Sequence, residues 1–428
     1  MPRDAIRTHT GDNAKAREQE AEIPFREAGR NAGLALVALV AVLAGAEGGL
    51  RLFAPQPLAE RYGATREGGP LVRIDPELGW TLRPNVAGLT SDEPWQADVR
   101  TNALGFRDVD HAEKAAGVTR VAVLGDSFVF GSGVRQAETL PGQLAARLGP
   151  SFEVINLGVP GYGTDQALLT LRRWGPGLKP DVVLAGFFWN DVMENASAKI
   201  YDMEKPRFLL SNGSLTLVPP RATSGLPAIG RFSAFLGSRS HLWSLAYRAL
   251  GKTDTVEPEE RPVMLDLSLR AAPASREKEF ELTWALVEAI AGEARALGAE
   301  PLVFTIPPRF LVDDAVREKV LEVYALSGEA FEPDGFFRVK EACARRNVRV
   351  VDLLPPFRTA ASSGEALFLP TGIHWSAAGN ALAARSLDAA VRAVARARDS
   401  RHRAAAAARI SGRAFPDRAG PAARMTGS

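Results

Sequence analysis

Short apolar runs alternate with stretches of helical periodicity along the chain from about residue 119 to 398. Five of these runs are rich in β-branched residues and bounded by turn signals, a pattern typical of buried parallel strands. The predicted strands cover residues 120–124, 152–156, 181–188, 301–306 and 348–353. The predicted helices lie mostly between them, at residues 140–148, 165–174, 275–297, 313–326, 335–346 and 377–395. This alternation predicts an α/β fold with a doubly wound parallel sheet.

A separate apolar run near the N-terminus favours one transmembrane helix over residues 31–53. Residues 32–46 are all apolar or small, and the longer segment is long enough to cross a bilayer. A cleaved signal peptide, with Ala44-Gly45-Ala46 as its cleavage site, and a buried core helix are the alternatives. Arg26 and Arg30 precede the run, which predicts a cytoplasmic N-terminus and an extracytoplasmic remainder. Signal cleavage would instead predict a secreted protein.

The other segments lack regular periodicity. Residues 1–30, which are polar and of mixed charge, and the Arg- and Ala-rich residues 399–428 are both predicted to be disordered, with a helix near 401–410 as an alternative for the second. Residues 54–118 predict a linker or small accessory region of short strands and turns, without a catalytic constellation. An insertion at residues 192–274 is interpreted either as a lid or substrate wall or as a loosely packed decoration.

Composition narrows the functional classes. The 428-residue chain is 46% hydrophobic and 24% charged, which fits a large folded domain with appendages. Its formal net charge is +2 and its basic residues form no folded motif, so a nucleic-acid partner is not indicated. Cys343 is the single cysteine, which excludes an intramolecular disulfide and predicts a small core residue. No Cys/His cluster indicates a metal, and no glycine motif implies a cofactor.

Candidate chemistry gathers in loops at the carboxyl ends of the predicted strands, the edge where open α/β sheets bind ligands. Gly125-Asp126-Ser127 follows the first strand, a loop with Gly158, Gly161 and Gly163 follows the second, and Asn190-Asp191 follows the third. Ser127 is either a nucleophile with a base in reach or the N-cap of the next helix. Of the five histidines, only His374 is expected at this edge, where it opens the last helix.

These residues resemble the SGNH (GDSL-type) hydrolases, a family of esterases, lipases and acyl hydrolases. The family's Gly-Asp-Ser motif falls on residues 125–127, and its oxyanion glycine falls on Gly161, five positions after Asn156. Its Asn-Asp pair falls on Asn190-Asp191, and its Asp-Gly-Ile-His motif falls on Thr371-Gly-Ile-His374. The resemblance implies a flavodoxin-like three-layer α/β/α sandwich with a five-stranded parallel sheet over residues 119–398.

The resemblance also implies a role for each site residue. Ser127 would attack the ester carbonyl while His374 takes its proton. The Ser127 N–H, the Gly161 N–H and the Asn190 side chain would hold the oxyanion. Asp126, Asp191 and Thr371 would support this centre.

Position 371 departs from the family pattern, which has Asp three residues before the histidine. Thr371 carries no charge to orient the imidazole. One solution is a Ser–His dyad, with a backbone carbonyl or the Thr371 hydroxyl holding the second ring nitrogen. Another is a carboxylate from elsewhere, for which Asp352 is the nearest candidate by sequence.

The layout further resembles a membrane-anchored bacterial subgroup of the family. Leu78-Gly79-Trp80, Pro84-Asn85 and Thr101-Asn102 with Gly105-Phe106-Arg107 carry this resemblance. Asn102, Gly105 and Phe106 also predict a tight turn with an aromatic anchor.

The implied activity is hydrolysis of an O-acyl ester, such as an acetyl ester, at the cell envelope through a serine ester. The implied partners are an ester substrate, such as an acylated glycan, and the membrane through residues 31–53. An O-acyltransferase on envelope glycans and a catalytically silent carbohydrate-binding protein are the alternatives. No metal or cofactor is expected.

Overall fold

The computed structural model describes residues 11–54, 64–65, 71–89, 97–200, 203–221, 240–249, 265, 268–270, 276–330, 334, 336–370 and 372–410. The chain divides into two compact units. One comprises Met1–Ala59 with Gly225–Val256, and the other comprises Glu60–Ser224 with Glu257–Ser428.

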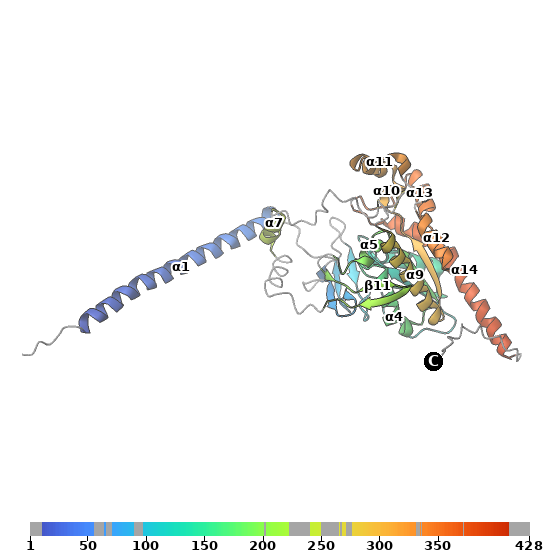
Figure 1. Cartoon of the computed structure of the whole chain (residues 1–428), viewed down its shortest axis with the longest axis horizontal. Helices are drawn as coiled ribbons and strands as arrows, with labels where there is room; N and C mark the ends of the chain where they lie inside the picture. Colours follow the sequence, from blue (N-terminus) through green and yellow to red (C-terminus); the bar gives the residue numbers. More distant parts are fainter. Residues whose placement is uncertain are drawn as a thin grey trace, which may run out of the picture. The chain divides into compact units, whose positions relative to one another are not determined.

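The larger unit is built on a five-stranded parallel sheet (Figure 1). In chain order its strands are β6 (Thr119–Gly125), β7 (Phe152–Gly158), β8 (Val182–Phe187), β13 (Glu300–Thr305) and β14 (Arg349–Val351). Their spatial order is β14-β13-β8-β6-β7, which is the 2-1-3-4-5 order of flavodoxin-like sheets. All five predicted strands and their parallel arrangement are confirmed. The order reverses between β6 and β8, where such sheets bind ligands.

Helices form the two outer layers (Figure 1). On one face, α4 (Thr164–Leu178) and α12 (Phe337–Arg345) contact α9 (Glu277–Ala296). On the other face, α3 (Leu140–Leu148) packs along α14 (Ala377–Ile410), which also contacts β8 and β13. The implied three-layer sandwich is therefore present. Shorter helices at the strand ends are α2 (Ser127–Phe130), α5 (Asn190–Ala196), α10 (Arg309–Val312), α11 (Asp314–Val323) and α13 (Leu354–Ser362).

The region before the sheet contains the short strands that its sequence predicts. β2 (Val72–Asp75) pairs with β3 (Gly79–Leu82), and β4 (Ala87–Leu89) pairs with both β1 (Ala64–Thr65) and β5 (Asp98–Arg100). The predicted turn is also present. The Asn102 Oδ1 accepts the Phe106 N–H at 2.9 Å, Gly105 has φ +86°, and the Phe106 side chain is fully buried. The aromatic anchor thus joins the core of the sheet unit.

The described part of the insertion packs on the same unit. β9 (Lys199–Ile200) pairs with β10 (Met203–Glu204), and β11 (Arg207–Ser211) pairs with β12 (Ser214–Val218). β11 contacts α5 and α9, and Phe208 is buried there. This part of the insertion is a packed wall rather than a loose decoration.

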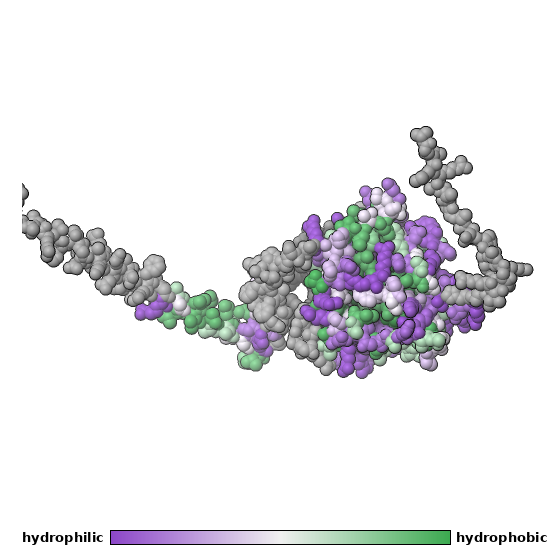
Figure 2. All heavy atoms as spheres, turned by 90° about the horizontal axis from the view of Figure 1, so that it is seen from below, coloured by the Kyte–Doolittle hydropathy of each residue, from purple (hydrophilic) through white to green (hydrophobic). Residues whose placement is uncertain are grey.

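The smaller unit contains α1 (Gly11–Phe53) and α7 (His241–Ala249). The stretch Arg30–Phe53 has a mean hydropathy of 2.0 and no buried residues, so it is long and apolar enough to cross a membrane. A signal sequence near an N-terminus has the same properties. Figure 2 shows this stretch as an apolar band along the helix. Near its end, the Glu47 carboxylate accepts the Ser240 hydroxyl and the backbone N–H groups of His241 and Leu242.

Two expectations of disorder are wrong where the structure describes the chain. Helix α1 begins at Gly11, and helix α14 continues to Ile410. Both extensions are rich in Ala, Arg and other strong helix formers, which propagate a helix from an adjoining one without an apolar face. The alternative of a helix over 401–410 is the one observed. Residues 1–10 and 411–428 lie outside the described residues.

We predict that Gly158→Ala destabilises the fold. A Cβ at Gly158 would lie 2.4 Å from the Phe130 backbone nitrogen and 2.7 Å from the Val129 carbonyl carbon, where no side chain can yield. The expected loss is about 1–3 kcal/mol in unfolding free energy, as for an overpacked core. Thermal and denaturant unfolding of the full-length chain in detergent would measure it.

Gly292→Ala is the matched control, because this exposed α9 glycine has no atom within 4 Å of a built Cβ. Its expected effect is a gain of about 0.5–1 kcal/mol, from better helix propensity. Equal stability changes in the two variants would contradict the packing argument.

Candidate active site

Ser127 and His374 lie far apart in the sequence, but their side chains meet at the carboxyl end of β6. The Ser127 Oγ lies 2.8 Å from the His374 Nε2, although 247 residues separate them. Both side chains are half-buried, so the pair is anchored but accessible. The alternative of a helix-capping Ser127 is wrong. Asp126 is the N-cap of α2 and accepts the Phe128 N–H at 2.9 Å, which leaves the serine hydroxyl to His374.

His374 lies at the end of a closed turn. The Leu369 N–H donates to the His374 carbonyl at 2.9 Å, and the Ser376 N–H donates to the Leu367 carbonyl at the same distance. Arg309 on α10 donates to the carbonyls of Leu369 and Pro370. Thr371 belongs to this turn by sequence but lies outside the described residues.

Aromatic rings hold the serine and histidine segments together. The Phe128 ring packs edge-on against the rings of His374 and Trp375, with its centroid 5.2 Å from the first and 5.1 Å from the second. Trp375 is buried and also packs on Phe357 at 5.1 Å. The residues that follow Ser127 and His374 therefore pack on one another, which fixes the separation of the two functional groups.

The glycine loop after β7 starts beside the end of β6, where the Val159 N–H donates to the Gly125 carbonyl at 3.1 Å, and Gly161 follows two residues later. This residue has φ +76°, a conformation that favours glycine, and it is buried between Pro160 and Tyr162. Within the described residues, the N–H groups of Gly161 and Ser127 donate to no backbone or side-chain acceptor. Gly158 and Gly163 are closely packed against other parts of the chain. A Cβ at either would meet neighbouring protein atoms within 3.0 Å, so these two glycines allow close packing of the chain.

Asn190 begins α5 and is held by a glutamate one turn later. Its Nδ2 donates to the Glu194 Oε1 at 2.8 Å. Glu194 is 2% exposed, and burial raises its pKa to about 8, so this acceptor is neutral at pH 7. Sequence reasoning did not single out Glu194. Its position four residues after Asn190 on a predicted loop-to-helix junction was the available signal.

A cluster of buried carboxyl groups lies beneath these loops. Burial raises the pKa of Asp126 to about 7 and holds the pKa of Asp191 well above its ordinary value, with Asp126 and Glu194 adding repulsion. Asp165 is fully buried and its pKa is also raised by burial, although the Lys205 ammonium bonds to it. Asp191 accepts the Phe188 N–H at 3.2 Å. The two acids named by the motif thus support loops and do not face the serine.

Asp352, the alternative orienting acid, has other partners. Its carboxylate accepts from the Lys340 Nζ at 3.0 Å, from the Thr305 hydroxyl at 3.1 Å and from the Leu354 N–H at 3.0 Å. These bonds tie β13, β14 and α12 together.

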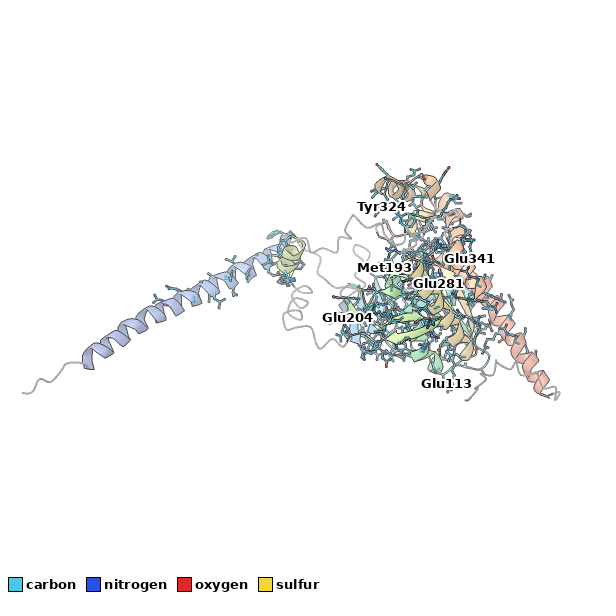
Figure 3. The ribbon with its side chains drawn as sticks, viewed as in Figure 1. Glu113, Met193, Glu204, Glu281, Tyr324 and Glu341 are labelled. Atoms are coloured by element: carbon cyan, nitrogen blue, oxygen red, sulfur yellow. The ribbon has the colours of Figure 1, made fainter. Side chains whose placement is uncertain are left out.

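Two exposed apolar side chains lie close in sequence to predicted site residues. Met193 lies on α5, one turn after Asn190, and is 41% exposed (Figure 3). Ile373 directly precedes His374 and is 44% exposed. Among the described residues, no group of three or more His, Cys, Asp or Glu side chains could hold a metal ion.

We predict that Asp126→Asn flattens the pH dependence of stability. The folded protein keeps the Asp126 proton up to about pH 7, whereas the unfolded chain loses it near pH 4, so unfolding free energy falls as the pH rises between these values. Asn keeps the capping oxygen and cannot ionise. Relative to wild type, the variant should gain up to about 4 kcal/mol between pH 4.5 and 7.5. Unfolding of the full-length chain across this range would measure it.

Asp399→Asn is the control for this comparison, because the Asp399 side chain is 49% exposed. Its stability profile should stay parallel to that of the wild type at every pH. A parallel profile for Asp126→Asn as well would contradict the raised pKa.

Solved structures with a similar fold are distant in sequence. An acetyl xylan esterase is 14% identical, with 64% of this chain and 99% of that chain covered at a TM-score of 0.34. An aryl esterase of M. smegmatis is 16% identical, with 65% and 100% covered at 0.34. A carbohydrate acetylesterase family member of Sinorhizobium meliloti is 14% identical, with 65% and 99% covered at 0.31. No curated protein sequence matches the chain.

Two family models match overlapping ranges of the chain. The model of the GDSL-like lipase/acylhydrolase family matches residues 123–330, a range that contains Ser127, Gly161 and Asn190. The model of the SGNH hydrolase-like domain of the acetyltransferase AlgX matches residues 268–419, a range that contains His374. Together with the flavodoxin-like sheet and the paired serine and histidine, these matches show that the chain belongs to the SGNH (GDSL-type) hydrolase family.

Proposed function

We propose that this protein is a serine acyl-ester hydrolase whose nucleophile is Ser127 and whose base is His374. The distance of 2.8 Å between the Ser127 Oγ and the His374 Nε2 carries the proposal, because it allows direct proton transfer. Ser127 attacks the ester carbonyl carbon as Nε2 takes its proton, and the alcohol leaves with that proton. Water, deprotonated by His374, then cleaves the acyl-serine to the free acid.

Three donors are suited to the oxyanion. The Ser127 and Gly161 N–H groups have no acceptor among the described residues, and the second N–H of the Asn190 amide complements the one bonded to Glu194. Because Glu194 is neutral below about pH 8, no adjacent anion opposes the developing charge. Removal of one such donor costs about 10²–10³ in turnover in comparable sites.

Asp352 is not the favoured partner for the second ring nitrogen of His374. The Asp352 carboxylate is bonded to Lys340, Thr305 and the Leu354 N–H, so the acid closest in sequence is already engaged. Thr371 precedes His374 by three positions in the sequence, and its hydroxyl or a backbone carbonyl stays our candidate for orienting the ring. Loss of the triad carboxylate lowers turnover by orders of magnitude but leaves catalysis measurable.

We place this activity at the cell envelope, on an acetylated glycan. The apolar stretch Arg30–Phe53 is long enough to anchor the chain, and the basic residues before it favour an extracytoplasmic catalytic unit. The AlgX acetyltransferase model and the small acyl groups named for the similar acetylesterases support an acetyl ester.

O-acetyl transfer to a glycan is the second candidate. It is favoured by the match of residues 268–419 to the acetyltransferase AlgX model, and it uses the same acyl-serine. A sugar hydroxyl replaces water as the acceptor in the second step. The silent carbohydrate-binding alternative is not favoured, because a merely binding cleft has no need of a paired serine and histidine.

We predict that Ser127→Ala lowers p-nitrophenyl acetate hydrolysis at least 10³-fold, since the nucleophile is lost. His374→Gln should cause a loss of similar size and prevent labelling of Ser127 by a fluorophosphonate. Ser386→Ala is the matched control, because the Ser386 hydroxyl bonds within α14 to the Leu382 carbonyl. Full activity in the Ser127→Ala protein would exclude the proposed mechanism.

A labelled-acetyl assay separates the two candidates. The full-length protein is given a ¹⁴C-acetyl donor ester with and without candidate envelope glycans. A hydrolase releases labelled acetate at a rate that the glycan does not change. Labelled glycan formed at the expense of acetate, and absent with Ser127→Ala, would instead establish transfer.

A further inference from the structure

The segment before the sheet touches both loops that carry the proposed catalytic groups. Trp80 contacts the glycine loop after β7, Leu78 contacts Gln166 on the helix that follows this loop, and Arg107 contacts the turn after α2. These residues belong to the Leu-Gly-Trp and Gly-Phe-Arg motifs, which show no chemistry of their own in the sequence. The side chains of Trp80 and Arg107 are completely buried, at 0% and 1% exposure.

Trp80 determines the direction of the Gly161 N–H. Its indole Nε1 donates to the Pro160 carbonyl at 3.1 Å, and its own carbonyl accepts the Tyr162 hydroxyl at 2.6 Å. The Pro160 carbonyl and the Gly161 N–H belong to one planar trans peptide, so they point in opposite directions. A carbonyl held toward Trp80 therefore holds the Gly161 N–H pointing away from Trp80.

The position of Trp80 is itself tightly fixed. Its ring packs edge-on against Tyr162 at 5.7 Å, and Gln166 on α4 donates to the Leu78 carbonyl at 2.8 Å. Gly79 has φ +82°, and a Cβ there would lie 2.3 Å from the carbonyl oxygen of Glu204, a residue labelled in Figure 3. The turn that presents Trp80 thus has one close-packed arrangement.

Arg107 acts on the serine backbone through two further peptide units. Its Nη1 donates to the carbonyls of Phe130 at 3.2 Å and of Gly131 at 2.5 Å. The N–H groups on the far sides of these same peptides, those of Gly131 and Ser132, donate to the Ser127 carbonyl at 2.9 and 3.1 Å. Each planar peptide therefore links the guanidinium on one side to Ser127 on the other.

The other terminal nitrogen of the Arg107 guanidinium links this turn to the segment before the sheet. Nη2 donates to the Asp98 carbonyl at 2.9 Å and to the Val134 carbonyl at 2.6 Å. A buried cation is costly unless it is hydrogen-bonded, and four carbonyl acceptors in two directions suit the two terminal nitrogens of the planar Arg fork. A Lys ammonium at the same place cannot span them.

We propose that Trp80 and Arg107 are positioning residues for the catalytic centre. Trp80 aims the Gly161 N–H at the oxyanion, and Arg107 holds the backbone of the nucleophile Ser127. The proposal rests on the proposed Ser127 mechanism, because it assigns these two residues to the groups that this mechanism uses.

The test compares Trp80→Phe and Arg107→Lys with wild type in the full-length protein in detergent. For p-nitrophenyl acetate, kcat should fall about tenfold or more in each variant, while KM changes less than about threefold, since misaimed groups weaken the transition state more than the substrate complex. Binding of phenylboronic acid, whose adduct with Ser127 places an oxygen in the oxyanion site, should weaken in proportion to kcat/KM. A merely structural role would not produce this proportionality.

Two matched variants change the same interface without touching either loop. Trp174→Phe alters a tryptophan that packs on Phe106 at 4.9 Å, and Arg173→Lys alters an arginine bonded to Asp75 and Glu77. Both should retain wild-type kcat, even where the melting temperature falls. If Trp80→Phe does not fold, Tyr162→Phe deletes the bond to the Trp80 carbonyl and keeps the ring, and it should lower kcat in the same direction.

The outcomes distinguish failure of the positioning role from failure of the proposed Ser127 mechanism. Wild-type kcat in folded Trp80→Phe, Tyr162→Phe and Arg107→Lys, together with an inactive Ser127→Ala, would overturn the positioning role alone. Retained hydrolysis in Ser127→Ala would overturn the proposed function itself. Equal losses of kcat in the control variants would also overturn the positioning role, because they would trace the effect to general packing.

Discussion

A hydrogen bond between two side chains that are 247 residues apart sets the demands on this fold. Ser127 follows β6 and His374 precedes α14, and neither segment can place its group alone. Parallel pairing of β6 with β7 and β8 fixes the strand that ends at the serine. The contact of Phe128 with Trp375 then fixes the histidine turn against it. The helix layers, the turn at His374 and the packing of Phe128 on Trp375 together set the distance between the Ser127 and His374 side chains.

The second constraint is electrostatic. Asp126, Asp165, Asp191 and Glu194 are buried near the sheet edge, and the Lys205 ammonium bonds to one of them. Water cannot solvate these carboxyl groups, so burial favours their neutral forms. A neutral carboxyl group can accept a hydrogen bond from an amide N–H, and it can hold a loop in this way without placing an anion beside an oxyanion. The same arrangement makes the fold less stable as the pH rises, because the unfolded chain gives up these protons more readily.

The sequence predicted the elements better than their contacts. All five strands and the order of the catalytic loops follow from local patterns, since apolar runs, turn residues and short motifs are read over a few positions. Asp126 as the cap in place of Ser127 was not foreseen, because both residues are good caps and only His374 decides between them. Glu194, Arg107 and Trp80 act through single hydrogen bonds to distant backbone groups, and such bonds leave no periodic trace. The helical extension over residues 11–30 was missed for the opposite reason, because propensity acts there without amphipathic spacing.

The contacts of Trp80 and Arg107 also bear on where the catalytic unit begins. An α/β pattern starts at residue 119, but the Pro160 carbonyl, the Gln166 amide and the carbonyls of Phe130 and Gly131 all bond to residues 78–107. Removal of that segment would leave several buried polar groups without partners and would uncover Trp174 and Tyr162, which pack on Phe106 and Trp80. Each unpaired buried group costs about 1–3 kcal/mol, which is a large part of the stability of an ordinary domain. We infer that the folding unit of the hydrolase includes residues 71–107, so this part of the predicted linker or small accessory region belongs to the enzyme.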